Sequence, residues 1–108
     1  MRKTSKPLIV LVTAPDMKVA RKLASAALQG KLAACVNLLP KVESHYWWKG
    51  KLDKASEVLA VFKTTSHLIS QLEAEIRRLH PYETPEFVAL PVKSASERYL
   101  SWWFGSVG

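Results

Sequence analysis

Cysteine and glycine are scarce in this chain of 108 residues. The single cysteine, Cys35, cannot form an internal disulfide, which excludes covalent cross-linking within the chain and agrees with a reducing, cytoplasmic location. Only four glycines occur, and none belongs to a phosphate-binding loop or a nucleophile elbow. The chain therefore lacks the usual signatures of nucleotide-binding and hydrolytic enzymes, and no organic cofactor is expected.

Long apolar runs are also missing. Residues 1–7 are basic and polar, and we expect them to form a flexible N-terminal segment. The run that follows, residues 8–12, is far too short for a signal-peptide core or a membrane span. We therefore expect no membrane partner and a single domain over residues 8–108.

The charge is strongly positive but dispersed. Sixteen Lys and Arg against nine Asp and Glu give a formal net charge of +7, and the cations are spread from Arg2 to Arg98. A nucleic-acid-binding protein would show a continuous basic stripe, a zinc-finger spacing or an aromatic RNP motif, and none of these is present. The charge is therefore interpreted as a solubility feature, and nucleic acid is not an expected partner.

The hydrophobic pattern predicts four strands and three helices. Strands are predicted over residues 8–12, 33–48, 57–63 and 87–90. Helices are predicted over residues 16–30 with Asp16 as N-cap, from an N-cap at Ser66 to a stop at Pro81, and over residues 96–104. This order fits an α+β, ferredoxin-like βαββαβ sandwich with two helices on one face of an antiparallel sheet and a short C-terminal helix.

Two of the strands are expected in the centre of the sheet and one at its edge. Residues 8–12 are apolar without alternation, and so is the strand over residues 57–63 between its charged ends Glu57 and Lys63. Such runs are typical of strands covered on both faces. The segment 33–48 contains Pro40, which cannot donate to a ladder and indicates an edge position or a local break.

Two helices can cover only one face of such a sheet, so the apolar side chains of the other face need a second cover. Another copy of the chain is the simplest cover. The long hairpin over residues 42–54 also projects Tyr46, Trp47 and Trp48 beyond the reach of either helix. These three aromatic residues are predicted to lie in an interface between subunits.

Several segments occur in one order that resembles the CutA family. They are residues 13–16 (TAPD), 32–37 (LAACVN) and 80–86 (HPYETPE), with Ser44, Tyr46, Trp48, Gly50 and Lys51 in the hairpin, Glu57 and residues 63–64 in the third strand, and residues 99–102 (YLSW) at the end. The resemblance implies a ferredoxin-like subunit and a tight homotrimer with strands that pair between subunits. It also implies a role in tolerance to divalent cations, copper especially, and a similarity to the trimeric PII signalling proteins.

Copper or another divalent cation is the expected ligand, and His80, Cys35 and Glu83 are the candidate donors. Two of them have a plainer interpretation. Cys35 lies in an apolar run as a small buried side chain would. His80 ends a helix, where it could complement carbonyl groups or bond to a carboxylate. The family members proposed to hold copper carry a cysteine and a second histidine where this chain has Val12 and Leu79. A metal site here would therefore need donors from elsewhere in the chain or from a neighbouring subunit.

A ligand cleft between subunits is the second candidate site. It would be lined by Glu57, Lys63, Tyr82, Glu86 and Trp48. Alternatively, Glu57 and Lys63 form ion pairs at strand ends and Trp48 fills an interface. The expected function is trimeric binding or sensing without turnover. The alternatives are a PII-like small-molecule sensor and a hydrolase that uses Cys35 with His80.

Overall fold

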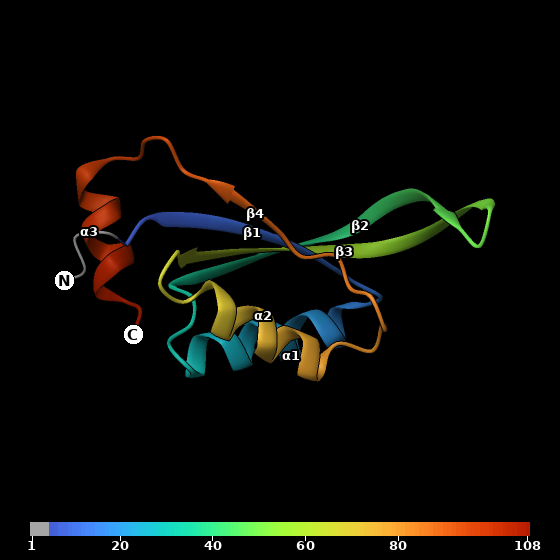
Figure 1. Ribbon diagram of the computed structural model, residues 1–108, viewed down its shortest axis with the longest axis horizontal. Coiled ribbons are helices and arrows are strands. Elements are labelled where there is room, and N and C mark those ends of the chain that lie inside the picture. The colour runs from blue at the N-terminus through green and yellow to red at the C-terminus, as the bar shows by residue number, and fades with distance from the viewer. Residues whose placement is uncertain (1–4) are drawn as a thin grey trace.

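Two helices lie against the same face of a four-stranded antiparallel sheet in the computed structural model, which describes residues 5–108 (Figure 1). The elements are β1 (Pro7–Ala14), α1 (Met17–Gln29), β2 (Cys35–Trp48), β3 (Lys51–Thr65), α2 (Ile69–Leu79), β4 (Val88–Pro91) and α3 (Glu97–Gly105). The strand order is β2-β3-β1-β4. The ferredoxin-like α+β fold, the two central strands and the edge position of the strand with Pro40 are all confirmed.

The N-terminal boundary differs from the expected one. β1 begins at Pro7, and the Lys6 backbone N–H donates to the Ser66 hydroxyl at 2.9 Å, so both residues belong to the folded unit. Residues 1–4 of the expected N-terminal segment lie outside the described residues. Among residues 5–108, no helix is long and apolar enough to cross a bilayer.

The core lies between the sheet and helices α1 and α2. From Val10 to Ala14 in β1 and from Val58 to Thr64 in β3, the even-numbered side chains point toward the helices and are at most 4% exposed, because side chains alternate between the faces of a strand. Each helix contributes one apolar stripe, while the cations of α1 stay exposed as expected. The buried residues of this core include Val10, Val12, Ala60 and Phe62 of the sheet, Leu23 and Ala27 of α1, and Leu72 and Ile76 of α2.

One predicted helix cap is confirmed and the other is wrong. The Asp16 carboxylate accepts a hydrogen bond from the Val19 N–H at 2.9 Å, which satisfies a donor in the first turn of α1. Ser66 does not cap α2, because β3 continues to Thr65 and the chain needs the turn at residues 66–68 before the helix can begin. The Ser66 hydroxyl instead accepts the hydrogen bond from Lys6.

A bulge at Pro40 and Lys41 changes the direction in which the side chains of β2 point. The register shifts between Leu39 and Val42, and Lys41 adopts a φ of 63°. Before the bulge, Val36 points toward the helices; after it, even-numbered residues point to the opposite side. The break that Pro40 predicted is therefore present, and it turns the alternate residues of the hairpin away from the helices.

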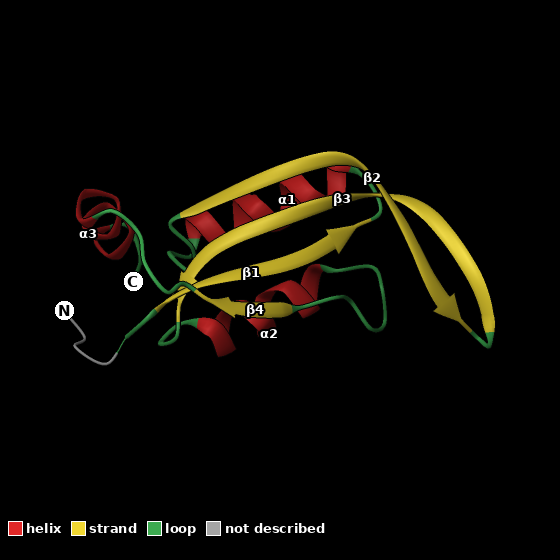
Figure 2. Cartoon of the chain, turned by 90° about the horizontal axis from the view of Figure 1, so that it is seen from above, coloured by secondary structure: helices red, strands yellow, loops and turns green. Residues whose placement is uncertain are grey.

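The sheet face turned away from α1 and α2 is called the open face here. It consists of Ile9, Leu11, Thr13, Cys35, Asn37, Leu39, Leu59, Val61, Val88 and Leu90, with Glu57 and Lys63 toward its two ends. Figure 2 looks onto this face, with the two helices behind the strands. Leu39, Val88 and Leu90 are 44–45% exposed. An apolar surface of this extent is unusual for an isolated subunit and indicates a docking face.

Helix α3 closes only one end of the sheet, far from the tip of the hairpin (Figure 1). Its anchor is Trp103, which is 2% exposed and donates from Nε1 to the Thr64 carbonyl at 2.9 Å. Ser96 caps the helix by accepting from the Tyr99 N–H. This placement brings Tyr99 next to β3 and leaves most of the open face uncovered.

Candidate functional site

An acidic cluster lies where β3 meets the loop between α2 and β4. It consists of Glu57, Tyr82 and Glu86. The Tyr82 hydroxyl donates to Glu57 Oε2 at 2.9 Å, and the Glu57 side chain is buried with 8% exposure. β3 holds the carboxylate at one end of the open face, and the loop carries the tyrosine over it. Three of the five residues predicted for the cleft therefore come together in one chain.

His80 fixes the loop that carries Tyr82. Its Nε2–H donates to the Thr13 carbonyl at 2.7 Å, and its Nδ1 accepts from the Tyr82 backbone N–H at 3.1 Å. Since β4 pairs with β1 only from Leu8 to Leu11, His80 bonds to β1 beyond the end of that pairing. The rings of His80 and Tyr82 also pack against each other, with centroids 4.7 Å apart. His80 is thus a positioning residue, as the plainer interpretation of its sequence context suggested, and both of its ring nitrogens are engaged.

The acidic cluster disfavours additional negative charge. Burial, the hydrogen bond to Glu57 and the nearby negative charge together raise the pKa of Tyr82 to about 12. Burial and the charge of Glu57 also raise the pKa of Glu86. Among residues 5–108, no Lys or Arg side chain forms an ion pair with either glutamate. In the described part of the chain, the acidic cluster therefore lacks a compensating cation.

We predict that Tyr82 ionises about two pH units above an ordinary tyrosine. Its folded pKa of about 12 exceeds the ordinary value of 10, so its contribution to stability is complete below pH 10 and is lost as the pH rises through 12. Absorbance at 295 nm during a pH titration measures this, with Tyr82→Phe used to identify the phenol concerned. Glu57→Gln should lower the transition toward pH 10. An unshifted transition in the wild type would disprove the hydrogen bond to Glu57.

A lysine cluster occupies the opposite end of the open face and consists of Lys63, Cys35 and Tyr99. The Lys63 ammonium donates to the Tyr99 hydroxyl at 3.0 Å and lies 4.0 Å from Cys35 Sγ. The hydrogen bond to Tyr99 raises the pKa of Lys63 in spite of partial burial. Cys35 is partly buried, and its thiol contacts Asn37 Oδ1 at 3.7 Å. Tyr99 was not predicted as a site residue, although it lies in a segment that carries the family resemblance.

The other two cleft residues lie apart from the acidic cluster within one chain. Lys63 is six residues from Glu57 along β3, which corresponds to about 20 Å at roughly 3.3 Å per residue. Trp48 lies near the tip of the hairpin, opposite Lys51. The alternative, in which Glu57 and Lys63 form ion pairs at strand ends, finds no support among residues 5–108, where neither side chain has such a partner.

The three candidate metal donors do not converge within one chain. Cys35 is aligned with Ile9 across the sheet, whereas His80 bonds to Thr13, about 13 Å further along β1 at roughly 3.3 Å per residue. Glu83 is exposed in the loop after His80. In the described part of the chain, no three His, Cys, Asp or Glu side chains could hold a metal ion. The same separation prevents Cys35 and His80 from acting as a catalytic pair in the subunit.

The aromatic side chains of the β2–β3 hairpin point to opposite sides of the hairpin. Tyr46 and Trp48 point to the same side as the open face, and Trp48 is 57% exposed. Trp47 points to the opposite side with its cross-strand neighbour Leu52, and both are 71% exposed. Only Tyr46 and Trp48 therefore extend the open face along the hairpin.

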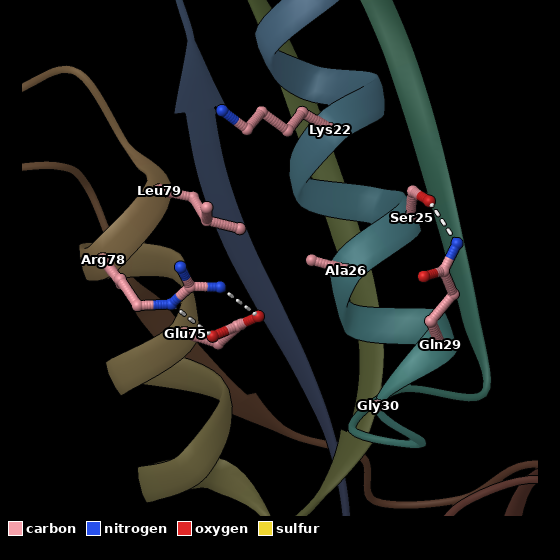
Figure 3. Close-up of a pocket in the computed structure, with 8 residues that line it drawn as sticks. All are labelled: Lys22, Ser25, Ala26, Gln29, Gly30, Glu75, Arg78 and Leu79. Atoms are coloured by element: carbon pink, nitrogen blue, oxygen red, sulfur yellow. Dashed lines mark hydrogen bonds and ion pairs between the residues drawn. The ribbon is translucent and has the colours of Figure 1, made fainter.

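A surface groove of about 580 Å³ lies between α1 and α2 (Figure 3). Ala26 and Leu79 lie between Lys22 on one side and Arg78 on the other, and Arg78 is held by two hydrogen bonds of 3.0 Å to Glu75. None of the sequence-predicted site residues lines this groove, which lies on the helical side of the molecule. The groove is therefore separate from the candidate sites of the open face.

Comparisons with known proteins agree on one family. The model of the CutA1 divalent ion tolerance protein family matches residues 8–106. Protein CutA of Mus musculus is 48% identical over 91 residues, which are 84% of this chain but about half (51%) of the mouse protein. The divalent-cation tolerance protein CutA of Thermus thermophilus is 43% identical over 87% of this chain and 91% of its own length.

A comparison with solved structures finds the same fold in this family. The crystal structure of CutA1 from Oryza sativa superposes with a TM-score of 0.93 at 38% identity and covers 95% of this chain and 94% of that one. The match to the family model, the identities of more than 40% and the shared ferredoxin-like fold all span nearly the whole chain. The chain therefore belongs to the CutA1 family of divalent-ion tolerance proteins.

Proposed function

We propose that this protein acts as a homotrimer that binds a cation or a small ligand between its subunits, without catalytic turnover, in the cytoplasm. The observation that carries the proposal is the uncovered apolar open face, which has a charged cluster toward each end. Among residues 5–108, α3 reaches only one end of this face and no other element covers it (Figure 1). Further copies of the chain would bury it and would bring the two kinds of cluster near the boundaries between subunits.

The edges of the sheet support assembly by the same chain. β2 and β4 are the outer strands, and each has one side without a strand partner in the sheet. β4 has only four residues, whereas β2 has fourteen and carries Tyr46 and Trp48 past the end of the helices. A neighbouring copy could pair with these edges and cover the aromatic side chains, which removes two features that promote aggregation of isolated sheets.

The proposed response to divalent cations depends on the assembled protein. His80, Cys35 and Glu83 do not form a site in one chain, and a metal at His80 would have to displace a hydrogen bond to Thr13 or Tyr82. Cys35 is the soft donor on the open face, where a neighbouring subunit could supply further ligands. We therefore expect copper binding to require Cys35 and the trimer, but not the His80 side chain.

Calorimetric titration with Cu(II) tests this expectation. Cys35→Ala should lower the affinity at least about tenfold, because it removes the thiolate that a soft cation favours. His80→Ala should leave the affinity within about twofold of the wild type, provided that circular dichroism shows the variant to be folded. The reverse pattern would show that His80 is the ligand. Unchanged binding in both variants would remove the specific metal site.

A PII-like small-molecule sensor is the second candidate. The lysine cluster favours it, since the Lys63 ammonium and the Tyr99 hydroxyl are held together as two polar groups that could contact an anionic ligand. Titration with a nucleotide separates the two functions. Tight nucleotide binding that is lost in Lys63→Met, together with no copper binding, would favour the sensor over the cation-binding protein.

A further inference from the structure

Two charged side chains of the open face lack a counter-charge among the residues that the structure describes. Glu57 is more than nine-tenths buried, and its hydrogen-bond partner is the neutral Tyr82 hydroxyl. Lys63 is partly buried, and its ammonium contacts the hydroxyl and ring of Tyr99 and the thiol of Cys35, all uncharged groups. Within residues 5–108, Glu57 forms no ion pair with Lys or Arg, and Lys63 forms none with Asp or Glu.

Because Glu57 is buried, the lack of a nearby cation destabilises its carboxylate. A buried carboxylate is strongly destabilised unless it is both hydrogen-bonded and paired with opposite charge. Besides burial, the charge of Glu57 raises the pKa of Glu86, and the Glu57 and Asp16 charges raise the pKa of Tyr82, so the groups around the cluster are acidic. The acidic cluster is therefore incomplete in a single chain, and a cation from outside the chain would stabilise it.

The lysine cluster has the complementary chemistry on the same face. Lys63 and Glu57 are both odd-numbered residues of β3, with the apolar residues Leu59 and Val61 between them. The hydrogen bond to Tyr99 holds the ammonium in one position, so less conformational entropy is lost when a carboxylate binds it. The face thus has an anionic end, an apolar middle and a cationic end.

We propose that Lys63 of a second copy of this chain completes the acidic cluster by pairing with Glu57. This inference rests on the homotrimer of the proposed function and specifies how its subunits contact one another. The anionic end of each open face would meet the cationic end of the next, in a head-to-tail contact that closes into a ring when it is repeated. Tyr46 and Trp48, on the same side of the hairpin, would cover the neighbour beyond Glu57.

Charge-reversal substitutions test the proposed pair of Glu57 with Lys63 of the second copy. Glu57→Lys and Lys63→Glu are made singly and together, and the dissociation constant of the assembly is measured by analytical ultracentrifugation. Each single reversal should weaken assembly at least about 30-fold, because it places like charges in contact. The double variant should recover to within about tenfold of the wild type. Additive effects in the double variant would disprove the pair.

Neutral variants and a matched control keep the test decisive if a reversed variant fails to fold. Glu57→Gln and Lys63→Met preserve side-chain size, and each should weaken assembly. Lys22→Glu reverses an exposed charge on α1 and should have no effect. An unchanged trimer in all Glu57 and Lys63 variants would overturn the pair while leaving the proposed trimer intact. A wild-type protein that is a single chain would instead overturn the proposed function.

A metal ion could take the place of Lys63 as the cation that pairs with Glu57. Analytical ultracentrifugation with and without EDTA distinguishes a metal ion from Lys63. If EDTA dissociates the wild type but not Glu57→Gln, and Lys63→Met assembles normally, an ion rather than lysine completes the cluster. That result would contradict the inference. Assembly that resists EDTA and depends on both Glu57 and Lys63 would support it.

Discussion

Replacing Val61 with aspartate is expected to convert the assembled protein into single chains. Val61 lies in the middle of the open face, between Leu11 of β1 and Asn37 of β2. If a neighbouring subunit covers this position, an aspartate there becomes a buried, unpaired carboxylate, which costs several kcal/mol. Size-exclusion chromatography with light scattering should show that the trimer is lost, while far-ultraviolet circular dichroism shows the same secondary structure.

Ser70→Asp is the matched control for this experiment. It adds the same charge at an exposed position of α2, on the other side of the sheet. It should leave the assembly unchanged, because the helical side is not part of the proposed interface. If Val61→Asp also stays trimeric, the open face is not the surface that joins the subunits.

Trp103→Ala is expected to cost about 3–5 kcal/mol of stability, the range typical of a buried tryptophan replaced by alanine. Trp103 is the only fully buried residue that α3 contributes, and its indole N–H satisfies the Thr64 carbonyl. The substitution leaves a cavity and an unpaired backbone acceptor, so α3 should detach from β3. Urea unfolding measures the loss of free energy.

The neighbouring Trp102 provides the comparison. It is 47% exposed and packs against Tyr99, with ring centroids 5.3 Å apart. Trp102→Ala should therefore cost less than half as much as Trp103→Ala. Trp103→Ala should also release Tyr99 from Lys63 and lower the pKa of that lysine, which NMR titration of the side chain can detect. Equal losses in the two variants would show that Trp103 is not the anchor.

Local patterns were sufficient to predict most of the fold. The unbroken apolar runs in β1 and β3 placed these strands in the centre. Pro40 indicated an edge position or a local break in β2, and the structure has both. The incorrect cap at Ser66 has a tertiary cause, because the pairing of β3 with β1 extends to Thr65 and delays the start of α2. Where strand pairing decides an element's end, helical spacing alone cannot locate it.

The candidate site was harder to predict from the sequence than the fold. The family resemblance singled out the segments of Glu57, Tyr82 and Glu86, which the structure brings together; their role in a cleft between subunits stays a prediction. The two hydrogen bonds that make His80 a positioning residue join it to Thr13 and Tyr82, and no sequence pattern reports such contacts. The contact between Tyr99 and Lys63 spans 36 residues and depends on how α3 docks.

The proposed ligand site and the Glu57–Lys63 pair both require further copies of the chain to cover the open face, so both depend on the molar mass of the wild-type protein in solution. Light scattering coupled to size exclusion measures this mass without any substitution. We expect three times the chain mass of 12.1 kDa at all working concentrations. A stable species with the mass of one chain would contradict this expectation.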